Sequence, residues 1–241
     1  MEFEDGNAAE CVLMRFDNRP NLTACVSSQI GCPVGCVFCA TGNSGFKRNL
    51  KPYEITEQLM IIQRDTGLRI SNVVFMGQGE PLLNLDNVLQ AIEIINNDIG
   101  IGTRRMTIST SGIIPGIRKL KEINFQSTVA LSLHAPNSDI RKKIMPIENK
   151  YNINDVIKEL KELVNTTGRR ATIEYTIIKG VNDSPKQAKE VLELIDGLHC
   201  NINIIPYNNA CNSNFEKPSI DTINKFKFIL ERSPHKVTVR L

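Results

Sequence analysis

The stretch Cys32-Pro-Val-Gly-Cys36-Val-Phe-Cys39 places three cysteines within eight consecutive residues. Iron–sulfur clusters are normally held by four cysteine thiolates. Three thiolates at this C-x3-C-x2-C spacing suit a [4Fe-4S] cluster and leave one iron without a protein ligand. The sequence therefore predicts that Cys32, Cys36 and Cys39 bind a cluster whose fourth iron is open to a small molecule.

An open fourth iron is the arrangement of radical S-adenosylmethionine (SAM) enzymes, in which the amino and carboxylate groups of SAM chelate that iron. Reductive cleavage of SAM then yields a 5′-deoxyadenosyl radical. We therefore expect two cofactors, a [4Fe-4S] cluster and SAM. Phe38 places an apolar ring beside the third cysteine, where it limits access of solvent to the cluster.

Two other roles for the cysteines are less consistent with the sequence. A structural zinc site needs a second pair of Cys or His ligands at short spacing, and no such pair exists among the remaining cysteines. A disulfide framework is not expected either, because seven is an odd number of cysteines and 241 residues suffice for an ordinary core.

Composition agrees with a protein of the reducing cytoplasm. Hydrophobic residues make up 41% of the chain, but no apolar run approaches the ~18 residues of a membrane span. The first residues, Met1-Glu-Phe-Glu-Asp5, are acidic, whereas a secretory signal begins with basic residues. The net charge of +3 permits a nucleic-acid partner without arguing for one. We expect no membrane association.

Short β-branched runs alternate with amphipathic stretches, which indicates parallel βα units. The expected strands cover residues 23–28, 72–76, 106–109, 129–132, 172–177 and 202–206. The expected helices cover residues 52–64, 84–97, 114–122, 153–165, 185–194 and 219–232, and a last strand covers residues 235–240. Six units are too few for a closed eight-stranded barrel, so we predict an α/β fold, an open, partial (β/α)6 barrel of the TIM type. We assign residues 1–22 to an N-terminal extension and residues 23–241 to the barrel.

Small and polar residues gather where the expected strands end, and we expect these loops to converge on one pocket. Gly77 and Gly79 permit close backbone approach, so Glu80 is a candidate acceptor for the SAM ammonium group, although the loop also reads as a plain turn. Ser109 and Ser132 are candidates for hydrogen bonds to SAM, or simply turn residues. A single histidine, His134, is more often packed than catalytic, and its position favours a cofactor contact.

Several motifs beyond the cysteine loop make a resemblance specific. They are Cys25-Val-Ser-Ser-Gln-Ile-Gly-Cys32, Gly77-Gln-Gly-Glu-Pro-Leu-Leu-Asn84, Ser109-Thr-Ser-Gly112, Ser132-Leu-His-Ala-Pro136, Arg141 to Pro146, Gly180-Val-Asn-Asp183 and Ile205-Pro-Tyr-Asn208. In this order and spacing, from about Glu10 onward, they resemble the RlmN/Cfr family of radical SAM RNA adenine methyltransferases, and its RlmN branch in particular.

The resemblance implies roles for individual residues. Cys32, Cys36 and Cys39 match the cluster ligands. The matches to SAM contacts are Gly79, Glu80, Ser109, Ser132, Leu133 through its backbone, His134 and Asn208. Glu10 matches the proton acceptor ahead of the cluster, a role that rests on the resemblance alone.

In the family's reaction one SAM methylates a cysteine near the carboxyl terminus, and the radical from a second SAM abstracts hydrogen from that S-methyl group. The carbon then adds to C2 of an adenine, and a disulfide to a cysteine matching Cys36 resolves the adduct. The resemblance implies 23S rRNA or tRNA as substrate, flavodoxin or ferredoxin as electron donor, and a monomer.

The matching methyl-carrying cysteine belongs just beyond Val237-Thr-Val-Arg240, and the family's accessory RNA-binding region belongs ahead of Glu10. We therefore expect this sequence to cleave SAM without methylating RNA, with Cys211 as a candidate substitute carrier. Two alternatives stay open, a radical SAM activase or oxidoreductase without methyl transfer, and a non-catalytic protein that binds the cluster and SAM.

Overall fold

The computed structural model describes residues 1–16, 19–209 and 214–240. The chain folds into two compact units. The first comprises Met1–Pro33, Ser44–Thr110 and Gln126–Val129, and the second comprises Val34–Asn43, Ser111–Phe125 and Ala130–Leu241. Among the described residues, no helix is both long and apolar enough to cross a lipid bilayer.

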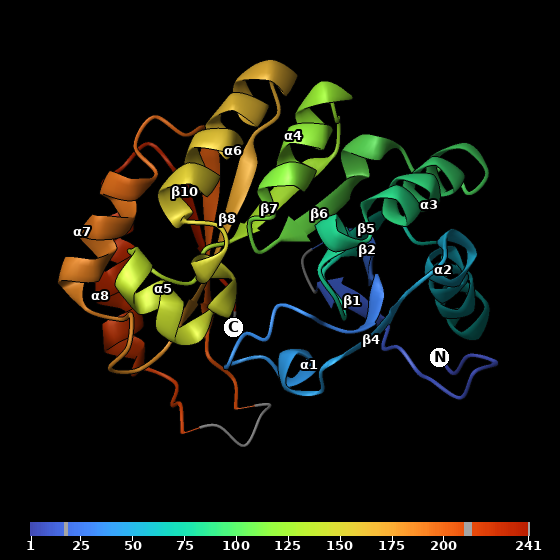
Figure 1. Ribbon diagram of the computed structural model, residues 1–241, viewed down its shortest axis with the longest axis horizontal. Coiled ribbons are helices and arrows are strands. Elements are labelled where there is room, and N and C mark those ends of the chain that lie inside the picture. The colour runs from blue at the N-terminus through green and yellow to red at the C-terminus, as the bar shows by residue number, and fades with distance from the viewer. Residues whose placement is uncertain (17–18, 210–213, 241) are drawn as a thin grey trace. The chain divides into compact units, whose positions relative to one another are not determined.

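The first unit contains four strands of the larger, eight-stranded sheet and a separate two-stranded sheet (Figure 1). Strands β1 (Val12–Phe16) and β2 (Arg19–Cys25) form an antiparallel pair. Strand β2 then pairs in parallel with β5 (Asn72–Phe75), and β5 with β6 (Met106–Thr110). Strands β3 (Gln29–Gly31) and β4 (Phe46–Asn49) form the small antiparallel sheet.

Two long helices of the first unit, α2 (Pro52–Thr66) and α3 (Leu85–Asn97), pack side by side. Helix α2 starts at a proline, whose fixed φ suits the first turn, and it ends at Gly67 with φ of +65°. Both helices bury residues at helical spacing, namely Ile55, Leu59 and Ile62, and Val88, Ile92 and Ile95. The short 3-10 helices η1 (Pro81–Leu83) and η2 (Thr103–Arg105) precede α3 and β6.

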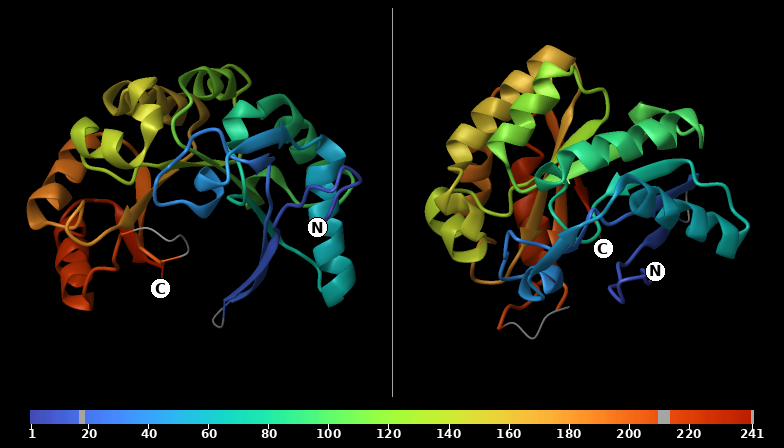
Figure 2. Two further views of the ribbon diagram at one scale, coloured as in Figure 1. Left: turned by 60° about the horizontal axis from the view of Figure 1, so that its bottom comes forward. Right: turned by 45° about the vertical axis from the view of Figure 1, so that its right-hand side comes forward.

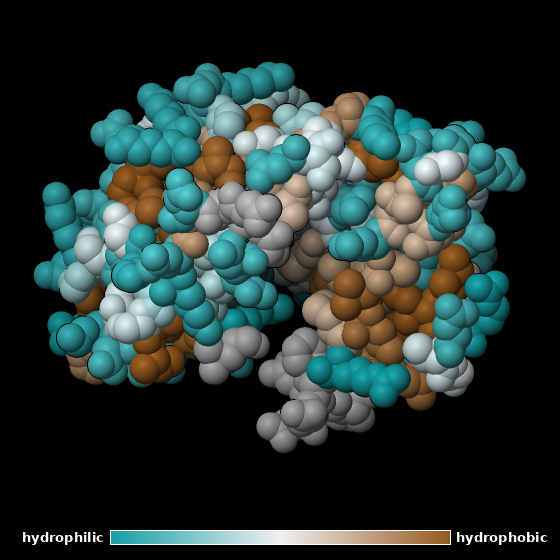
Figure 3. Space-filling view, turned by 90° about the horizontal axis from the view of Figure 1, so that it is seen from below, coloured by the Kyte–Doolittle hydropathy of each residue, from teal (hydrophilic) through white to brown (hydrophobic). Residues whose placement is uncertain are grey.

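Apolar side chains also reach the surface of the first unit. Val12, Tyr53 and Met60 are each about half exposed. Figure 3 shows a brown apolar area on this unit, toward the right of the view, among teal hydrophilic side chains.

The second unit is built on parallel strands. Strand β7 (Thr128–Ser132), whose residues from Ala130 belong to this unit, pairs with β8 (Ala171–Ile177), β8 with β9 (Cys200–Pro206), and β9 with β10 (Lys236–Val239). The helices are α1 (Ala40–Asn43), α4 (Ile114–Glu122), α5 (Ser138–Ile144), α6 (Ile153–Thr167), α7 (Pro185–Leu194) and α8 (Ile220–Leu230), with the 3-10 helix η3 (Pro146–Asn149).

Helices of the second unit pack in pairs, α4 beside α6 and α7 beside α8 (Figure 2). Arg118 of α4 lies 2.6 Å from Glu159 of α6, and Lys121 lies 2.6 Å from Glu162, so ion pairs link the first pair of helices. Helix α7 opens with a capping box, because the Ser184 amide donates to Gln187 Oε1 at 2.8 Å and the Ser184 hydroxyl accepts from the Gln187 amide at 3.3 Å.

The predicted fold class, an α/β fold of βα units, is confirmed. Each expected long helix and the final strand are present, with ends that shift by one or two residues. The first expected strand, 23–28, is wrong in its bounds, since β2 covers Arg19–Cys25. Pairing with β1 extends β2 toward the N-terminus, and Gln29 starts a strand of the other sheet. The division at residues 22 and 23 stays a prediction.

Candidate functional site

The cysteine loop begins at the end of β3 with a close backbone contact. The Cys32 amide donates to the Gly45 carbonyl at 3.0 Å. Gly31 has φ of +72°, and a Cβ there would lie 1.8 Å from the Gly45 oxygen. Glycine at position 31 is therefore required where the chain enters the loop, because any side chain would collide with backbone.

Cys36 and Cys39 lie in the second unit, on a turn held by its own backbone. The Cys39 amide donates to the Cys36 carbonyl at 3.1 Å, and the Val37 amide donates to the Ile144 carbonyl at the end of α5 at 3.0 Å. Apolar side chains around Cys36 and Phe38 pack on a buried group formed by Ala135, Ile144 and Met145. This packing fixes the loop against α5.

The residues of this loop fit an iron–sulfur cluster by their chemistry. All three cysteines are partly exposed and none forms a disulfide. Thiolates are the ligands that clusters use, and Phe38 supplies an apolar neighbour. Among residues 1–16, 19–209 and 214–240, no three Cys, His, Asp or Glu side chains are grouped closely enough to hold a metal ion. Ligation by Cys32, Cys36 and Cys39 therefore stays a prediction.

The loop after β5 passes so close to the β2–β3 segment that two of its positions have no space for a side chain. A Cβ at Gly77 would lie 2.6 Å from Ser27 Oγ. A Cβ at Gly79, where φ is +105°, would lie 2.6 Å from Gln29 Cβ. Both reasons for glycine that the sequence offered, close approach and positive φ, are thus present in this loop.

Glu80 follows this loop and is only 3% exposed. Its amide donates to Gln29 Oε1 at 2.8 Å, and its Oε1 accepts from the Leu82 amide at 3.1 Å, which caps η1. Glu80 therefore has the turn role that the loop suggested, and its contact with SAM stays a prediction.

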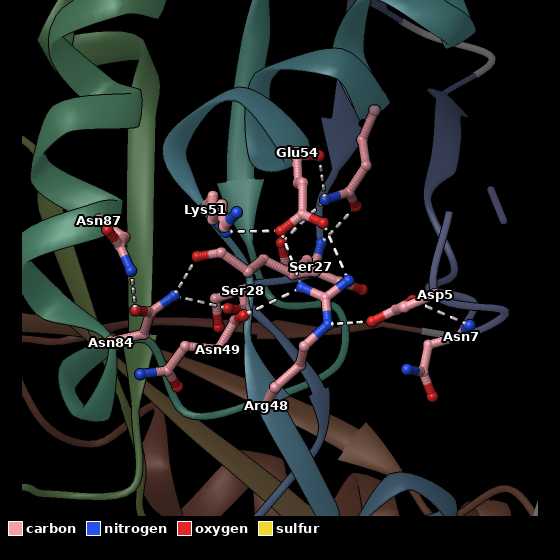
Figure 4. A network of polar contacts seen from close by, with 12 residues as sticks. Asp5, Asn7, Ser27, Ser28, Arg48, Asn49, Lys51, Glu54, Asn84 and Asn87 are labelled. Carbon is pink, nitrogen blue, oxygen red and sulfur yellow. Dashed lines mark hydrogen bonds and ion pairs between the residues drawn. The ribbon is translucent and has the colours of Figure 1, made fainter. Parts of the chain in front are cut away.

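A network of polar contacts fastens the segments around this loop (Figure 4). Asn84 is buried, and its Nδ2 donates to the carbonyls of Ser28 and Leu50, both at 2.8 Å. Arg48 donates to both oxygens of Glu54 at 2.9 Å and to Asp5 at 2.6 Å. Asn84 was given no role from the sequence. The Gly77–Asn84 motif contains this residue, but it does not reveal that the side chain binds two backbone carbonyls.

Glu10 belongs to the same unit as the loop after β5. It lines a pocket of about 650 Å³ together with Cys11, Gln78 and other residues near the N-terminus. Ser27 links the two segments, since its hydroxyl donates to the Glu10 carbonyl at 2.7 Å and accepts from the Gln78 amide at 2.9 Å. Ser109, also in this unit, donates its hydroxyl to the Phe75 carbonyl at 2.9 Å.

Leu133 and His134 follow β7 in the second unit. Leu133 is fully buried, and its amide donates to the Glu174 carbonyl at 3.0 Å. His134 has φ of +53°, which is uncommon outside glycine. The Thr176 amide donates to His134 Nδ1 at 2.9 Å, so the proton of the neutral ring lies on Nε2. His134 is therefore a hydrogen-bond donor of fixed tautomer.

Burial, assisted by the charge of Arg141, lowers the pKa of His134 to about 3. The ring of Phe38 contacts His134 edge to face, with centroids 5.0 Å apart. A neutral imidazole at physiological pH agrees with the expectation that His134 contacts a cofactor rather than exchanging protons as an acid or base.

Two buried residues that sequence reasoning left without a role fix the Ser132–His134 turn. Arg141 donates to the carbonyls of Leu133 at 3.2 Å and Ser132 at 3.4 Å, and it forms a buried ion pair with Glu148 at 2.8 Å. Asn182 donates Nδ2 to the carbonyls of His134 at 2.8 Å and Thr176 at 2.7 Å. Their motifs were visible in the sequence, but a fully buried Arg has no sequence signal.

Asn208 is exposed and lies just after β9, where the sequence placed it. Cys211, the candidate substitute carrier, lies outside the described residues. The predicted site residues thus come from both units, with Glu10, Cys32, Gly79, Glu80 and Ser109 in the first and the others in the second. Their convergence on one pocket stays a prediction.

The state of His134 predicts a pH dependence of stability. Its folded pKa of about 3 lies below the ordinary 6.5, so only the unfolded chain takes up this proton between those values. The stabilisation is complete above pH 6.5 and is lost as the pH falls toward 3. Urea unfolding at several pH values from 4 to 6 gives the slope of the unfolding free energy against pH. This slope should be smaller in His134→Gln than in the unaltered protein, by about 1.4 kcal/mol per pH unit. Equal slopes for the two proteins would show that His134 is already protonated when folded.

Comparison with known proteins agrees with this geometry. The family model described as the radical SAM superfamily matches residues 26–195. The probable dual-specificity RNA methyltransferase RlmN of Microcystis aeruginosa is 46% identical over 100% of this chain and 71% of its own length. That of Alkaliphilus oremlandii is 44% identical over 98% of this chain and 69% of its own.

A solved structure is similar over the same extent. The crystal structure of a radical SAM methyltransferase from Sphaerobacter thermophilus is 40% identical and has a TM-score of 0.94, covering 99% of this chain and 71% of that one. Sequence and structure therefore agree that this chain belongs to the RlmN family of radical SAM methyltransferases.

Proposed function

We propose that this protein is a radical SAM RNA methyltransferase that methylates C2 of adenine in 23S rRNA or tRNA. The observation that carries the proposal is identity of 44 to 46% with RlmN proteins over nearly the whole chain, with the C-x3-C-x2-C loop at Cys32, Cys36 and Cys39. No observation favours an activase, an oxidoreductase or a non-catalytic protein.

When bound, a [4Fe-4S] cluster and SAM supply a 5′-deoxyadenosyl radical, the reagent that attacks an unreactive position. In our proposal Cys32, Cys36 and Cys39 hold the cluster, and the Phe38 ring limits solvent beside it. Cys36 has a second role in this proposal: its thiolate would attack the sulfur of the methyl-carrying cysteine, so that a disulfide forms as the bond between that sulfur and the transferred carbon breaks and releases the product.

Other residues hold SAM and move a proton in this proposal. Glu80 accepts from the ammonium group, since a carboxylate forms strong, charge-assisted hydrogen bonds to such a group and this one is fixed beside Gly79 by the Leu82 amide. His134 donates from Nε2, because Nδ1 is occupied by the Thr176 amide. Glu10 accepts the proton that the product loses. The remaining proposed contacts use the backbone at Gly79 and Leu133 and the side chains of Ser109, Ser132 and Asn208.

We further propose that the protein acts as a monomer in the cytoplasm and receives electrons from flavodoxin or ferredoxin. The function is tested by incubating RNA with reconstituted protein, SAM and reductant, followed by mass spectrometry of nucleosides. We expect 2-methyladenosine when a methyl-carrying cysteine takes part, either Cys211 or the matching cysteine beyond Arg240, and we expect the product to disappear when Cys36 is replaced by Ala. If SAM cleavage were instead coupled to the modification of a different substrate, the proposed methyl transfer would be wrong and the protein would have another radical SAM activity.

Glu80 offers a separate test of the cofactor contact. Glu80→Gln preserves an acceptor for the Leu82 amide but removes the charge, so SAM binding should weaken by roughly 1.5–3 kcal/mol, or about 10- to 150-fold in Kd. Calorimetry on the reconstituted protein measures the loss, and Glu57→Gln on the exposed side of α2 is the matched control. A Kd equal to that of the control would leave Glu80 with its turn role only.

A further inference from the structure

A pocket of about 430 Å³ lies in the second unit, at the end of the sheet opposite the predicted SAM contacts. Its lining includes Arg170, Asp196, His199, Cys200, His235 and Lys236. These residues precede or begin β8, β9 and β10, whereas Ser132 and Asn208 lie where strands end. Seven residues of strand separate the two ends of β8, about 20 Å at the usual rise. The pocket is therefore distinct from the predicted cofactor contacts of the second unit.

Positive charge dominates the lining of this pocket. Arg170 and Lys236 are cationic and exposed, and the one carboxylate in the lining belongs to Asp196. Neither cation forms an ion pair with any of the described residues. Burial raises the pKa of Cys200 to about 12, so this thiol adds no negative charge at neutral pH.

Arg170 is held in place by neutral acceptors. Its Nε donates to His199 Nε2 at 3.1 Å, and its Nη1 donates to Asn201 Oδ1 at 3.1 Å. Arg48, Arg118 and Arg141 instead each bind a carboxylate. An oriented guanidinium whose charge is not compensated is suited to bind a phosphate group, which matches its planar set of donors.

The two imidazoles of the pocket differ in their hydrogen bonds. His199 Nε2 accepts from Arg170, so the ring proton lies on Nδ1. His235 Nδ1 lies 3.2 Å from the Cys200 carbonyl, an acceptor only, so Nδ1 carries a proton there. The Cys200 carbonyl thus uses the Nδ1 proton of His235, so His199 Nδ1, beside Arg170, is the imidazole donor available to a ligand in the pocket.

We propose that this pocket binds a phosphate group of the RNA backbone. That the phosphate belongs to RNA rests on the proposed function. The choice of a phosphate as the occupant rests on charge complementarity, because backbone phosphates are the common partners of Arg and Lys in RNA-binding proteins. The pocket would hold RNA at a point of the second unit remote from Ser132 and Asn208.

The first test uses the three histidines of the chain as probes. Inorganic phosphate is titrated into the full-length protein at constant pH, and the histidine ring signals are followed by NMR. The proposal expects His199 and His235 to shift and saturate, while the buried His134 stays unchanged. Arg170→Gln/Lys236→Gln should abolish the shifts. Absence of saturable shifts at His199 and His235 in the unaltered protein would overturn the proposal.

The second test distinguishes RNA from free phosphate. Arg170→Gln/Lys236→Gln should weaken binding of substrate RNA roughly tenfold and reduce the slope of log K against log salt by about 1. The control Arg64→Gln/Lys225→Gln removes the same charge at exposed positions outside the pocket and should retain affinity. Equal RNA affinity for both double variants would overturn the proposal even if phosphate binds. SAM cleavage should persist in each, so failure of the pocket is separable from failure of the proposed methyl transfer.

Discussion

Protein reconstituted anaerobically with iron and sulfide is expected to contain about four irons per chain, and the variant Cys32→Ala/Cys36→Ala/Cys39→Ala close to none. The three thiols lie within one short loop, whose entry requires glycine at position 31 and whose turn is fixed by the amide of Val37. Loss of the ligands should remove the brown absorption and all SAM cleavage, while circular dichroism stays unchanged.

Cysteines elsewhere in the chain provide a matched control. Cys11, Cys25 and Cys200 are likewise free of disulfides, and burial raises the pKa of Cys25 to about 11, so it is a poor thiolate. Their joint replacement by Ala should preserve iron binding. If the first variant retained about four irons, or if the second lost them, the cluster ligands would have to be reassigned.

The second large effect is expected at Arg141, which is fully buried and pairs with the buried carboxylate of Glu148. Arg141→Met leaves Glu148 without its cationic partner and removes the donor that Arg141 supplies to the carbonyls of Ser111, Leu133 and Ser132. Removing one member of a buried pair typically costs about 3–5 kcal/mol of unfolding free energy. We expect a loss of that size in urea unfolding.

Two comparisons make the Arg141 experiment specific. Arg64→Met removes an exposed arginine beside Asp65 and should cost less than about 1 kcal/mol. Arg141→Met/Glu148→Leu removes both charges and should recover part of the loss, because no uncompensated buried carboxylate remains. A loss at Arg141 no larger than at Arg64 would contradict the anchoring role of this ion pair.

Local signals explain why most elements were predictable from the sequence. Helix α7 has Ser184, Pro185 and Gln187 at its start, which are the residues of a capped first turn. Strands β8 and β9 are almost continuously buried, and each carries several β-branched residues, which marks it as a strand although polar residues interrupt the apolar ones. The β3–β4 pair was missed because its strands are short and one is mostly exposed.

The residues of the candidate site also differ in whether the sequence alone could predict their roles. Gly79 was recognisable because a positive φ and a close approach both demand glycine. The functions of Arg141 and Asn182 depend instead on backbone carbonyls that are distant in the sequence or come from a turn, and no local pattern encodes such partners. The phosphate pocket was missed for the same reason, since Arg170, His199 and Lys236 meet only when β8, β9 and β10 pair.

The central claim is that three cysteines hold a [4Fe-4S] cluster whose fourth iron binds SAM. Mössbauer spectroscopy of protein reconstituted with ⁵⁷Fe, recorded before and after addition of SAM, tests this claim most directly. The account predicts that SAM changes the parameters of one iron in four and leaves the other three unchanged. Four irons that stay equivalent when SAM is bound, or zinc in place of iron, would contradict it.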